Sequence, residues 1–336
     1  MGKVVSIRRG NCGKMRKGFI SYSTTDRHDD RGLYKQLGEV WLLCYFNGMT
    51  VASYIQIDAG RCRHCGACAR VCPLVRFGGV TGVQEAPREY CLQCGHCAAV
   101  CPQGAVLHPA FPPESLRPAP VPSLDSVEQM LLTRRSVRHF DKRQVERAHW
   151  EALLAQMALA PSGMNARPVR ATVVTDAEKL TAFTRLTGQF YDGLLLLLET
   201  PLNRLALRLA IGKDGLTRLR DNAEKLSVVC RLIREGEDPI LYRAPGALIL
   251  HAERTAACGH DDCQLAAMAG MLAAPALGLG TCMIGFLLPP FQRMSALRKL
   301  IQLPVSHEVY AVLAVGYPTV QYQYAPPRPG IPVTWQ

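Results

Sequence analysis

Apolar positions follow two different periods over the C-terminal two thirds of this chain. Helical spacing is found over residues 127–134, 147–158, 176–186, 262–277 and 291–300. Short strand-like apolar runs cover residues 170–175, 247–252 and 309–315. Strands interleaved with helices of this length predict a layered α+β or α/β domain.

The rest of the chain separates into three regions. Residues 1–48 are basic and polar without sustained periodicity, so we interpret them as an extension without regular structure or an upstream translation start that is not used. Residues 50–108 form a cysteine-rich module. Residues 109–125 are rich in proline, which predicts a semi-rigid linker before the large domain at 126–336.

Hydropathy predicts a cytoplasmic protein without a membrane anchor. With 48% hydrophobic and 20% charged residues, the chain has the composition of a packed globular protein. Its most apolar runs, residues 40–46 and 194–198, are too short to cross a bilayer, and we expect the second to lie in a buried helix. No long apolar stretch follows Arg8 and Arg9, as a secretory signal would require.

The cysteines indicate metal ligation. In a chain without an export signal, clustered thiols point to metal ligands rather than disulfides. Two copies of the pattern C-x₂-C-x₂-C-x₃-C-P contain Cys62, Cys65, Cys68, Cys72, Cys91, Cys94, Cys97 and Cys101. The six other cysteines share no ligand spacing: Cys12, Cys44, Cys230, Cys258, Cys263 and Cys282.

This repeat predicts two [4Fe–4S] clusters. A cubane needs four thiolates: three from a tight loop, and the fourth from the Cys-Pro end of the other half. The glycines at 66 and 95 would let each loop wrap close to its cluster. One cluster would then be held by Cys62, Cys65, Cys68 and Cys101, and the other by Cys91, Cys94, Cys97 and Cys72.

Structural zinc and redox CxxC pairs are the alternatives. Zinc modules, however, use CxxC pairs separated by a longer spacer. Over about residues 55–108 the module resembles bacterial two-cluster ferredoxins, in which two neighbouring clusters form a short path for electrons. His64 and His96 lie inside the cysteine loops, and we expect them to be surface or outer-sphere residues.

Four sequence blocks mark the larger domain. RRSVR at 134–138 places three arginines and a serine where a phosphate or an acidic ring edge would be bound. A polar loop, PSGMN at 161–165, precedes a predicted strand. The glycine-rich turn GLGTCMIG covers 278–285, and GYP at 316–318 is followed by PPRP at 326–329.

Together these blocks resemble the FMN-dependent nitroreductase family over about residues 126–330. The resemblance implies an α+β domain that binds FMN non-covalently at the interface of an intertwined homodimer. It implies phosphate, ribityl and pyrimidine contacts from Arg134, Arg135, Ser136, Arg138 and Arg328. It also implies flavin contacts from Ser162 and Asn165, and a ring site lined by Met283, Ile284 and Gly285.

The chain departs from the family pattern at Arg167-Pro168-Val169, where glutamine, proline and tryptophan are common. Arg167 would place a positive charge near the flavin, or would form a surface salt bridge.

The net charge of +12 does not predict a nucleic-acid or membrane partner. Residues 1–48 contribute +5 of this charge. Two clusters and an FMN phosphate would carry about −2 each, which leaves the rest of the chain near neutral.

The sequence therefore predicts an enzyme that passes electrons through two [4Fe–4S] clusters to FMN and on to an electron-poor nitro, quinone or enone compound. Reduced ferredoxin or flavodoxin is the expected donor, with NAD(P)H as an alternative, because no G-x-G-x-x-G dinucleotide motif is present. No catalytic side chain is identified. An electron-carrier subunit and a flavin-based redox sensor that acts on a protein partner remain the alternatives.

Overall fold

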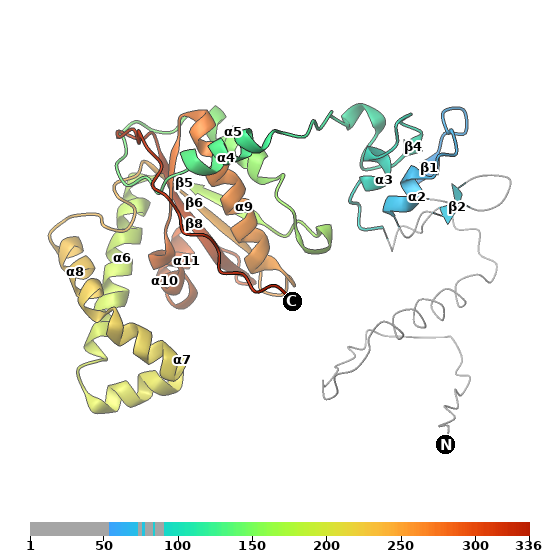
Figure 1. Cartoon of the computed structure of the whole chain (residues 1–336). Coiled ribbons are helices and arrows are strands. Elements are labelled where there is room, and N and C mark those ends of the chain that lie inside the picture. The colour runs from blue at the N-terminus through green and yellow to red at the C-terminus, as the bar shows by residue number, and fades with distance from the viewer. Residues whose placement is uncertain (1–53, 73–75, 78–82, 85–90) are drawn as a thin grey trace, which may run out of the picture. The chain divides into compact units, whose positions relative to one another are not determined.

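The computed structural model describes residues 54–72, 76–77, 83–84 and 91–336, shown in colour in Figure 1. Residues Tyr54–Gln336 form one compact unit. The predicted extension over residues 1–48 lies outside the described residues. None of the helices in the described part combines the length and apolar character that crossing a bilayer requires.

The cysteine module repeats one small unit twice. Each copy is a cysteine loop followed by a short helix, α2 (Ala67–Val71) or α3 (His96–Ala99). Both helices begin after a left-handed glycine, with φ 75° at Gly66 and 73° at Gly95. The antiparallel strand pairs are β1 (Gln56–Ile57) with β4 (Val106–Leu107) and β2 (Arg76–Phe77) with β3 (Val83–Gln84).

The larger domain is built on a four-stranded antiparallel sheet. Its strand order is β5-β6-β8-β7. The strands are β5 (Arg170–Val174), β6 (Gly246–Glu253), β7 (Gly280–Met283) and β8 (His307–Gly316). Three of them match the predicted strands, and the sheet with its helices confirms the predicted α+β class.

Helices cover both faces of this sheet (Figure 1). Helices α5 (Arg147–Met157) and α9 (Gly259–Ala273) pack on one face. The other face carries α6 (Ala177–Leu196), α10 (Leu288–Arg293) and α11 (Ser295–Leu300). The pleat of β6 sends Leu248 and Leu250 to the first core and Ala247 and Ile249 to the second. This two-sided burial explains why the strand is a continuous apolar run.

Two sequence expectations need correction. The turn expected at 278–285 contains the edge strand β7, whose first residue, Gly280, touches Val137: an added Cβ would lie 2.8 Å from Cγ2 of that valine. The leucine run at 194–198 ends α6 but is not buried, since Leu196 and Leu197 are 61% and 39% exposed. These leucines follow the part of α6 that packs on the sheet.

Three further helices lie outside the sheet layers. Helix α4 (Leu124–Thr133) begins at a serine cap, where Ser123 Oγ accepts the Ser126 N–H at 3.2 Å. Helices α7 (Pro201–Asp221) and α8 (Ala223–Arg234) follow α6 and were not predicted. Figure 1 shows α7 at the end of this helical extension remote from the sheet.

Candidate functional site: two cysteine loops and an arginine-edged cleft

The first four-thiol group surrounds one small apolar cavity. Cys62, Cys65 and Cys68 contribute from the first cysteine loop (residues 62–68), and Cys101 contributes from the other half of the repeat. Burial raises the pKa of Cys68, and the nearby Cys101 and Cys62 thiols act in the same direction. The structure thus brings together the cross-tied set expected for one cluster.

The second four-thiol group gathers around Cys97. Burial raises the pKa of this thiol to about 11, and its neighbours Cys72, Cys91 and Cys94 also raise it. The second cysteine loop (residues 91–97) supplies three of these thiols, and Cys72 comes from the first half of the repeat. Bound iron would displace the thiol protons, because coordinating thiols are deprotonated.

In the described ranges, no three His, Cys, Asp or Glu side chains lie close enough together to hold one metal ion. A zinc ion needs its sulfur ligands at about 2.3 Å from one centre. A cubane distributes its four thiolates over four iron atoms and asks for a wider arrangement.

His108 is a neighbour of the second group that the sequence reasoning missed. Its ring is 2% exposed, and its Nε2 atom lies 3.6 Å from Cys91 Sγ. Burial lowers the pKa of His108. His64 and His96, the two histidines inside the loops, are exposed as expected. His108 lies outside the repeated spacing, so no local pattern marked it.

The RRSVR block runs alongside β7. Ser136 forms a parallel bridge with Thr281, and the Val137 N–H donates to the Thr281 carbonyl at 2.9 Å. The extended backbone sends alternate side chains to opposite sides. Arg135 and Arg138 therefore border two different cavities along this sheet edge.

One of these cavities, which we call the β7 cleft, brings together four of the predicted flavin residues. Its volume is about 450 Å³. It is lined by Arg138, Tyr191, Ile240, Tyr242, Cys282, Met283, Ile284, Gly285 and Phe286. Hydrogen bonding to Tyr242 raises the pKa of Arg138, so the guanidinium remains a fixed cation at the cleft.

The walls of the cleft are held by polar contacts from several elements. Tyr191 Oη donates to the Phe286 carbonyl at 3.0 Å, and burial raises the pKa of Tyr191 to about 12. Tyr242 and Arg243 both adopt left-handed backbone conformations, with φ 58° and 56°. Such strained residues cluster at functional sites. Tyr191, Tyr242 and Phe286 carried no motif that could have identified them from sequence.

Ser162 and Asn165 lie at the opposite edge of the sheet. They belong to the loop of residues 161–168, the PSGMN loop, which leads directly into β5. Ser162 borders a separate cavity of about 200 Å³ that it shares with Arg167. Two strands, β6 and β8, separate this edge from β7.

The PSGMN loop has a strained and well-anchored backbone. Met164, Asn165 and Arg167 adopt φ values of 51°, 54° and 50°. The buried Asp262 carboxylate accepts the Gly163 N–H at 2.9 Å, and Ser162 Oγ accepts the Arg167 N–H at 3.0 Å. Non-glycine residues of this kind persist only where the surroundings enforce them.

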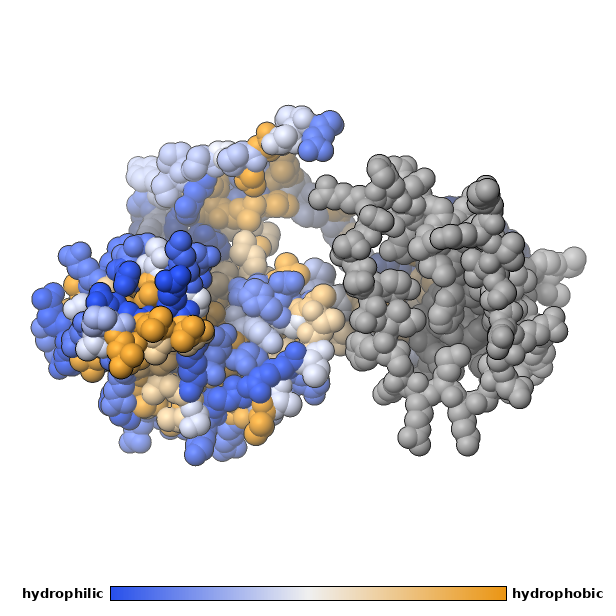
Figure 2. Space-filling view, turned by 90° about the horizontal axis from the view of Figure 1, so that it is seen from below, coloured by the Kyte–Doolittle hydropathy of each residue, from blue (hydrophilic) through white to orange (hydrophobic). Residues whose placement is uncertain are grey.

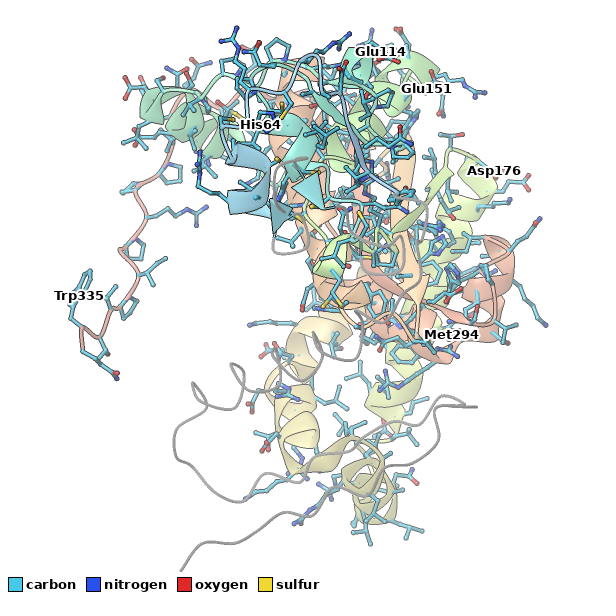
Figure 3. All side chains as sticks on the ribbon, turned by 90° about the vertical axis from the view of Figure 1, so that its right-hand side faces the viewer. His64, Glu114, Glu151, Asp176, Met294 and Trp335 are labelled. Atoms are coloured by element: carbon cyan, nitrogen blue, oxygen red, sulfur yellow. The ribbon has the colours of Figure 1, made fainter. Side chains whose placement is uncertain are left out.

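The remaining predicted flavin residues lie around these sites. Arg134 ends α4 and is half-buried, and Ser136 lies against β7. Arg135 Nη2 lies 3.5 Å from the Tyr324 carbonyl and borders a cavity of about 540 Å³. Arg328 is exposed on the extended C-terminal segment, whose end at Trp335 is labelled in Figure 3.

Paired thiol groups joined to an α+β domain define an iron–sulfur oxidoreductase. The chain belongs to the nitroreductase family, whose model matches residues 131–317. The model of the 4Fe-4S dicluster domain matches residues 54–102.

One similar protein is the "Putative NADH dehydrogenase/NAD(P)H nitroreductase" of Archaeoglobus fulgidus. It is 30% identical over 190 residues, which cover 56% of this chain and 84% of that protein. A Bacteroides fragilis nitroreductase with bound FMN is 23% identical, covers 62% of this chain and 98% of its own, and has a TM-score of 0.46. A Desulfitobacterium hafniense nitroreductase with bound FMN is 19% identical, covers 63% and 100%, and has the same TM-score of 0.46.

Proposed function

We propose that this oxidoreductase takes single electrons into two [4Fe–4S] clusters, one in each four-thiol group, and uses FMN to reduce an electron-poor nitro, quinone or enone compound. The β7 cleft carries the proposal, because it joins an arginine fork to an apolar wall at the edge of the sheet. A reduced ferredoxin or flavodoxin is the proposed donor, with NAD(P)H as the alternative.

The β7 cleft fits a flavin. Its volume of about 450 Å³ lies within the range of small-molecule sites, roughly 300–1,000 Å³. Arg138 supplies a permanent charge, and guanidinium forks suit phosphates and the polar edges of flat rings. Met283, Ile284 and Gly285 would contact the ring, and an added Cβ at Gly285 would meet no atom within 4 Å. When bound, FMN exchanges electrons singly or in pairs.

A second copy of the chain would complete this site. The β7 cleft and the PSGMN loop lie at opposite edges of the sheet, three strand spacings or about 14 Å apart. The strands between them are covered on both faces by the core. One flavin would therefore touch both sets of predicted residues only if the cleft came from one chain and the loop from another.

Exposed apolar surface supports this homodimer. Leu202, Leu205 and Leu209 on α7 are 75%, 54% and 82% exposed, and α4 exposes Met130 and Leu131. Figure 2 shows hydrophobic side chains gathered on the face seen from below, the side on which α7 lies in Figure 1. Patches of this kind on a soluble domain mark interaction surfaces.

The test compares two arginine variants of protein reconstituted without oxygen. Arg138→Ala should raise the dissociation constant of FMN about ten- to a hundred-fold, because a charge-assisted hydrogen bond contributes roughly 1.5–3 kcal/mol. Arg143→Ala is the matched control, since Arg143 stacks 3.8 Å above the Tyr317 ring outside the cleft. Iron and sulfide should stay near eight per chain in both.

Unchanged FMN binding in Arg138→Ala would place the flavin elsewhere. A protein that binds FMN and iron but turns over none of the small acceptors would instead be an electron carrier.

A further inference from the structure

The PSGMN loop touches the second cysteine loop. Asn165 Nδ2 donates to the Leu92 carbonyl at 3.0 Å and to the Gln93 carbonyl at 2.7 Å. Leu92 and Gln93 are the two residues between the ligand cysteines Cys91 and Cys94. Both amide hydrogens of Asn165 are thereby directed at the backbone of one cluster loop.

Arg167 reinforces this contact. Its Nε donates to Asn165 Oδ1 at 3.3 Å, which leaves the Nδ2 side of the amide facing the two carbonyls. The Arg167 guanidinium also lies 5.9 Å from the centre of the Phe111 ring, and Phe111 packs in the core of the cysteine module. The strained loop is therefore connected to the module through two side chains.

Among the described residues, the hydrogen bonds of the first cysteine loop stay within its own module, where Arg70 Nη1 donates to the Cys65 carbonyl at 3.2 Å. The cluster held by Cys91, Cys94, Cys97 and Cys72 is thus the one that faces the PSGMN loop.

We infer that the second cluster delivers electrons across the dimer, from the module of one chain to the flavin bound in the β7 cleft of its partner. The inference rests on the proposed function and its two-chain site. Asn165 fixes the second cluster beside the PSGMN loop, and this loop lies across the sheet from the β7 cleft of its own chain. The flavin near this loop is then the one whose arginines belong to the other chain.

The electron balance is simple. A reduced ferredoxin-type protein would give one electron to the cluster of the first four-thiol group, from which it would pass to the cluster of the second. Two such electrons and two protons from solvent would convert one oxidised flavin to its fully reduced form, and both clusters would be oxidised again. Asn165 is a positioning residue in this scheme, because it holds the cluster loop and exchanges no electrons.

Mixed dimers distinguish transfer across the dimer from transfer within one chain. The first damage, to the clusters, is the pair Cys65→Ser and Cys94→Ser, which removes a ligand from each cluster. The second damage, to the flavin site, is the pair Arg134→Ala and Arg138→Ala, which empties the β7 cleft. Two affinity tags allow dimers to be purified with both damages on one chain or with one damage on each chain. Either dimer retains one flavin site.

Transfer across the dimer gives a definite pattern. With the damages on separate chains, the remaining flavin faces the intact clusters of the arginine-deficient chain, and reduced ferredoxin should bleach it at the wild-type rate. With both damages on one chain, that flavin faces the broken clusters, and bleaching should be at least about ten-fold slower. Dithionite, which reaches flavin directly, should bleach it in both dimers. The reverse pattern, or equal rates with ferredoxin, overturns the inference.

Flavin and iron content, subunit mass and bleaching of the wild-type protein are measured first. Absence of FMN, of clusters or of the dimer defeats the proposed function itself, whereas a complete protein with the reverse pattern defeats only the transfer across the dimer.

Asn165→Asp tests the positioning contact separately. The substitution keeps the shape and tolerates the left-handed backbone, but it turns a double donor toward two carbonyl oxygens into an acceptor. Loss of the two hydrogen bonds should lower the fraction of molecules in which the second cysteine loop contacts the PSGMN loop. The rate of flavin bleaching by ferredoxin should therefore fall about ten- to a hundred-fold.

Hydrogen exchange at residues 92–94 should increase in the same variant, while iron content stays unchanged. Gln156→Glu adds an equal charge at an exposed position of α5 and should change neither readout. If flavin bleaching and hydrogen exchange in Asn165→Asp match those of the wild-type protein, Asn165 does not position the second cysteine loop.

Discussion

His108 and Cys91 are joined by a hydrogen bond whose direction the structure determines. His108 Nδ1 accepts the Ala110 N–H at 3.1 Å, so the ring proton of the neutral imidazole lies on Nε2, which faces Cys91 Sγ at 3.6 Å. The Gln93 N–H reaches the same sulfur at 3.4 Å. Hydrogen bonds to cluster sulfurs raise the reduction potential, because the reduced cluster carries more negative charge.

Replacing His108 with leucine should therefore lower the reduction potential of the cluster proposed for the second four-thiol group. A hydrogen bond worth roughly 0.5–1.5 kcal/mol corresponds to about 20–60 mV for one electron. A redox titration followed by electron paramagnetic resonance measures the shift. His96→Leu is the control, because His96 lies in the same cysteine loop as Cys91 but is exposed. Equal shifts in both variants would mean that the His108 bond has no specific effect.

The sequence predicted the thiol groups well because the ligand pattern is local. Six of the eight proposed ligands follow from spacings inside the two short cysteine loops, and the repeat also implies that the other two, Cys72 and Cys101 at the Cys-Pro ends, are exchanged between halves. His108 was not predicted because it lies outside the repeated motif. It contacts Cys91 only in the folded module, and the cysteine spacing does not specify that contact. The glycines expected to tighten the loops, Gly66 and Gly95, do adopt left-handed conformations.

The sequence did not predict where the flavin residues lie in the fold. The four blocks resemble one family, but a motif carries no information on which edge of a sheet it occupies. Arg138 and Met283 meet in the β7 cleft, whereas Ser162 lies beyond two buried strands. The cleft also depends on Tyr242, whose left-handed backbone no motif in the sequence marks.

Asp238 is the residue that holds this backbone. Its carboxylate accepts four hydrogen bonds, at 2.7 Å from Thr184 Oγ1 and at 2.9–3.1 Å from the N–H groups of Ile240, Leu241 and Arg243. Asp238→Ala should lower the free energy of unfolding by about 2–4 kcal/mol, because several charge-assisted bonds are lost at once. Urea unfolding measures this loss, and weaker FMN binding should accompany it.

Glu237→Ala is the control for Asp238. Glu237 pairs with Arg243 Nη2 at 2.8 Å, but both side chains are largely exposed, so the change should stay within about 0.5 kcal/mol. Similar losses in the two variants would show that the Asp238 turn does not anchor the cleft.

Close packing at Gly246 gives a third prediction. An added Cβ at the start of β6 would lie 2.6 Å from Cζ2 of Trp150, which is buried. Gly246→Ala should therefore destabilise the protein by about 1–3 kcal/mol in urea unfolding. An added Cβ at Gly193, in helix α6, would meet no atom within 4 Å, so Gly193→Ala should be neutral or stabilising by up to about 1 kcal/mol. Equal stability of the two variants would contradict the tight contact at Trp150.

The contact between the buried His251 and the half-buried His307 predicts loss of stability in mild acid. His251 on β6 faces His307 on β8, with their Nδ1 atoms 2.8 Å apart, and its Nε2 lies 3.2 Å from Thr172 Oγ1. Burial lowers the pKa of His251 to about 4, and His307 and Arg170 act in the same direction. Only one of the two facing nitrogens needs a proton for this hydrogen bond, and a second proton would oppose it.

Proton linkage determines whether the free energy of unfolding rises or falls with pH. An unfolded histidine has a pKa of about 6.5, so between pH 6.5 and 4 the unfolded chain binds more protons than the folded one. The contribution of His251 is complete above pH 6.5 and is lost as the pH falls through this window. From pH 7.5 to pH 5, the free energy of unfolding should decrease by about 2 kcal/mol through this group alone.

Urea unfolding at the two pH values tests this in matched variants. His251→Gln removes the titrating ring and should make the decrease smaller by about 2 kcal/mol. His260→Gln should leave it unchanged, because His260 is exposed beside Asp261. A decrease of the same size in His251→Gln would assign the acid sensitivity to other groups, and the His251–His307 contact would then have no part in it.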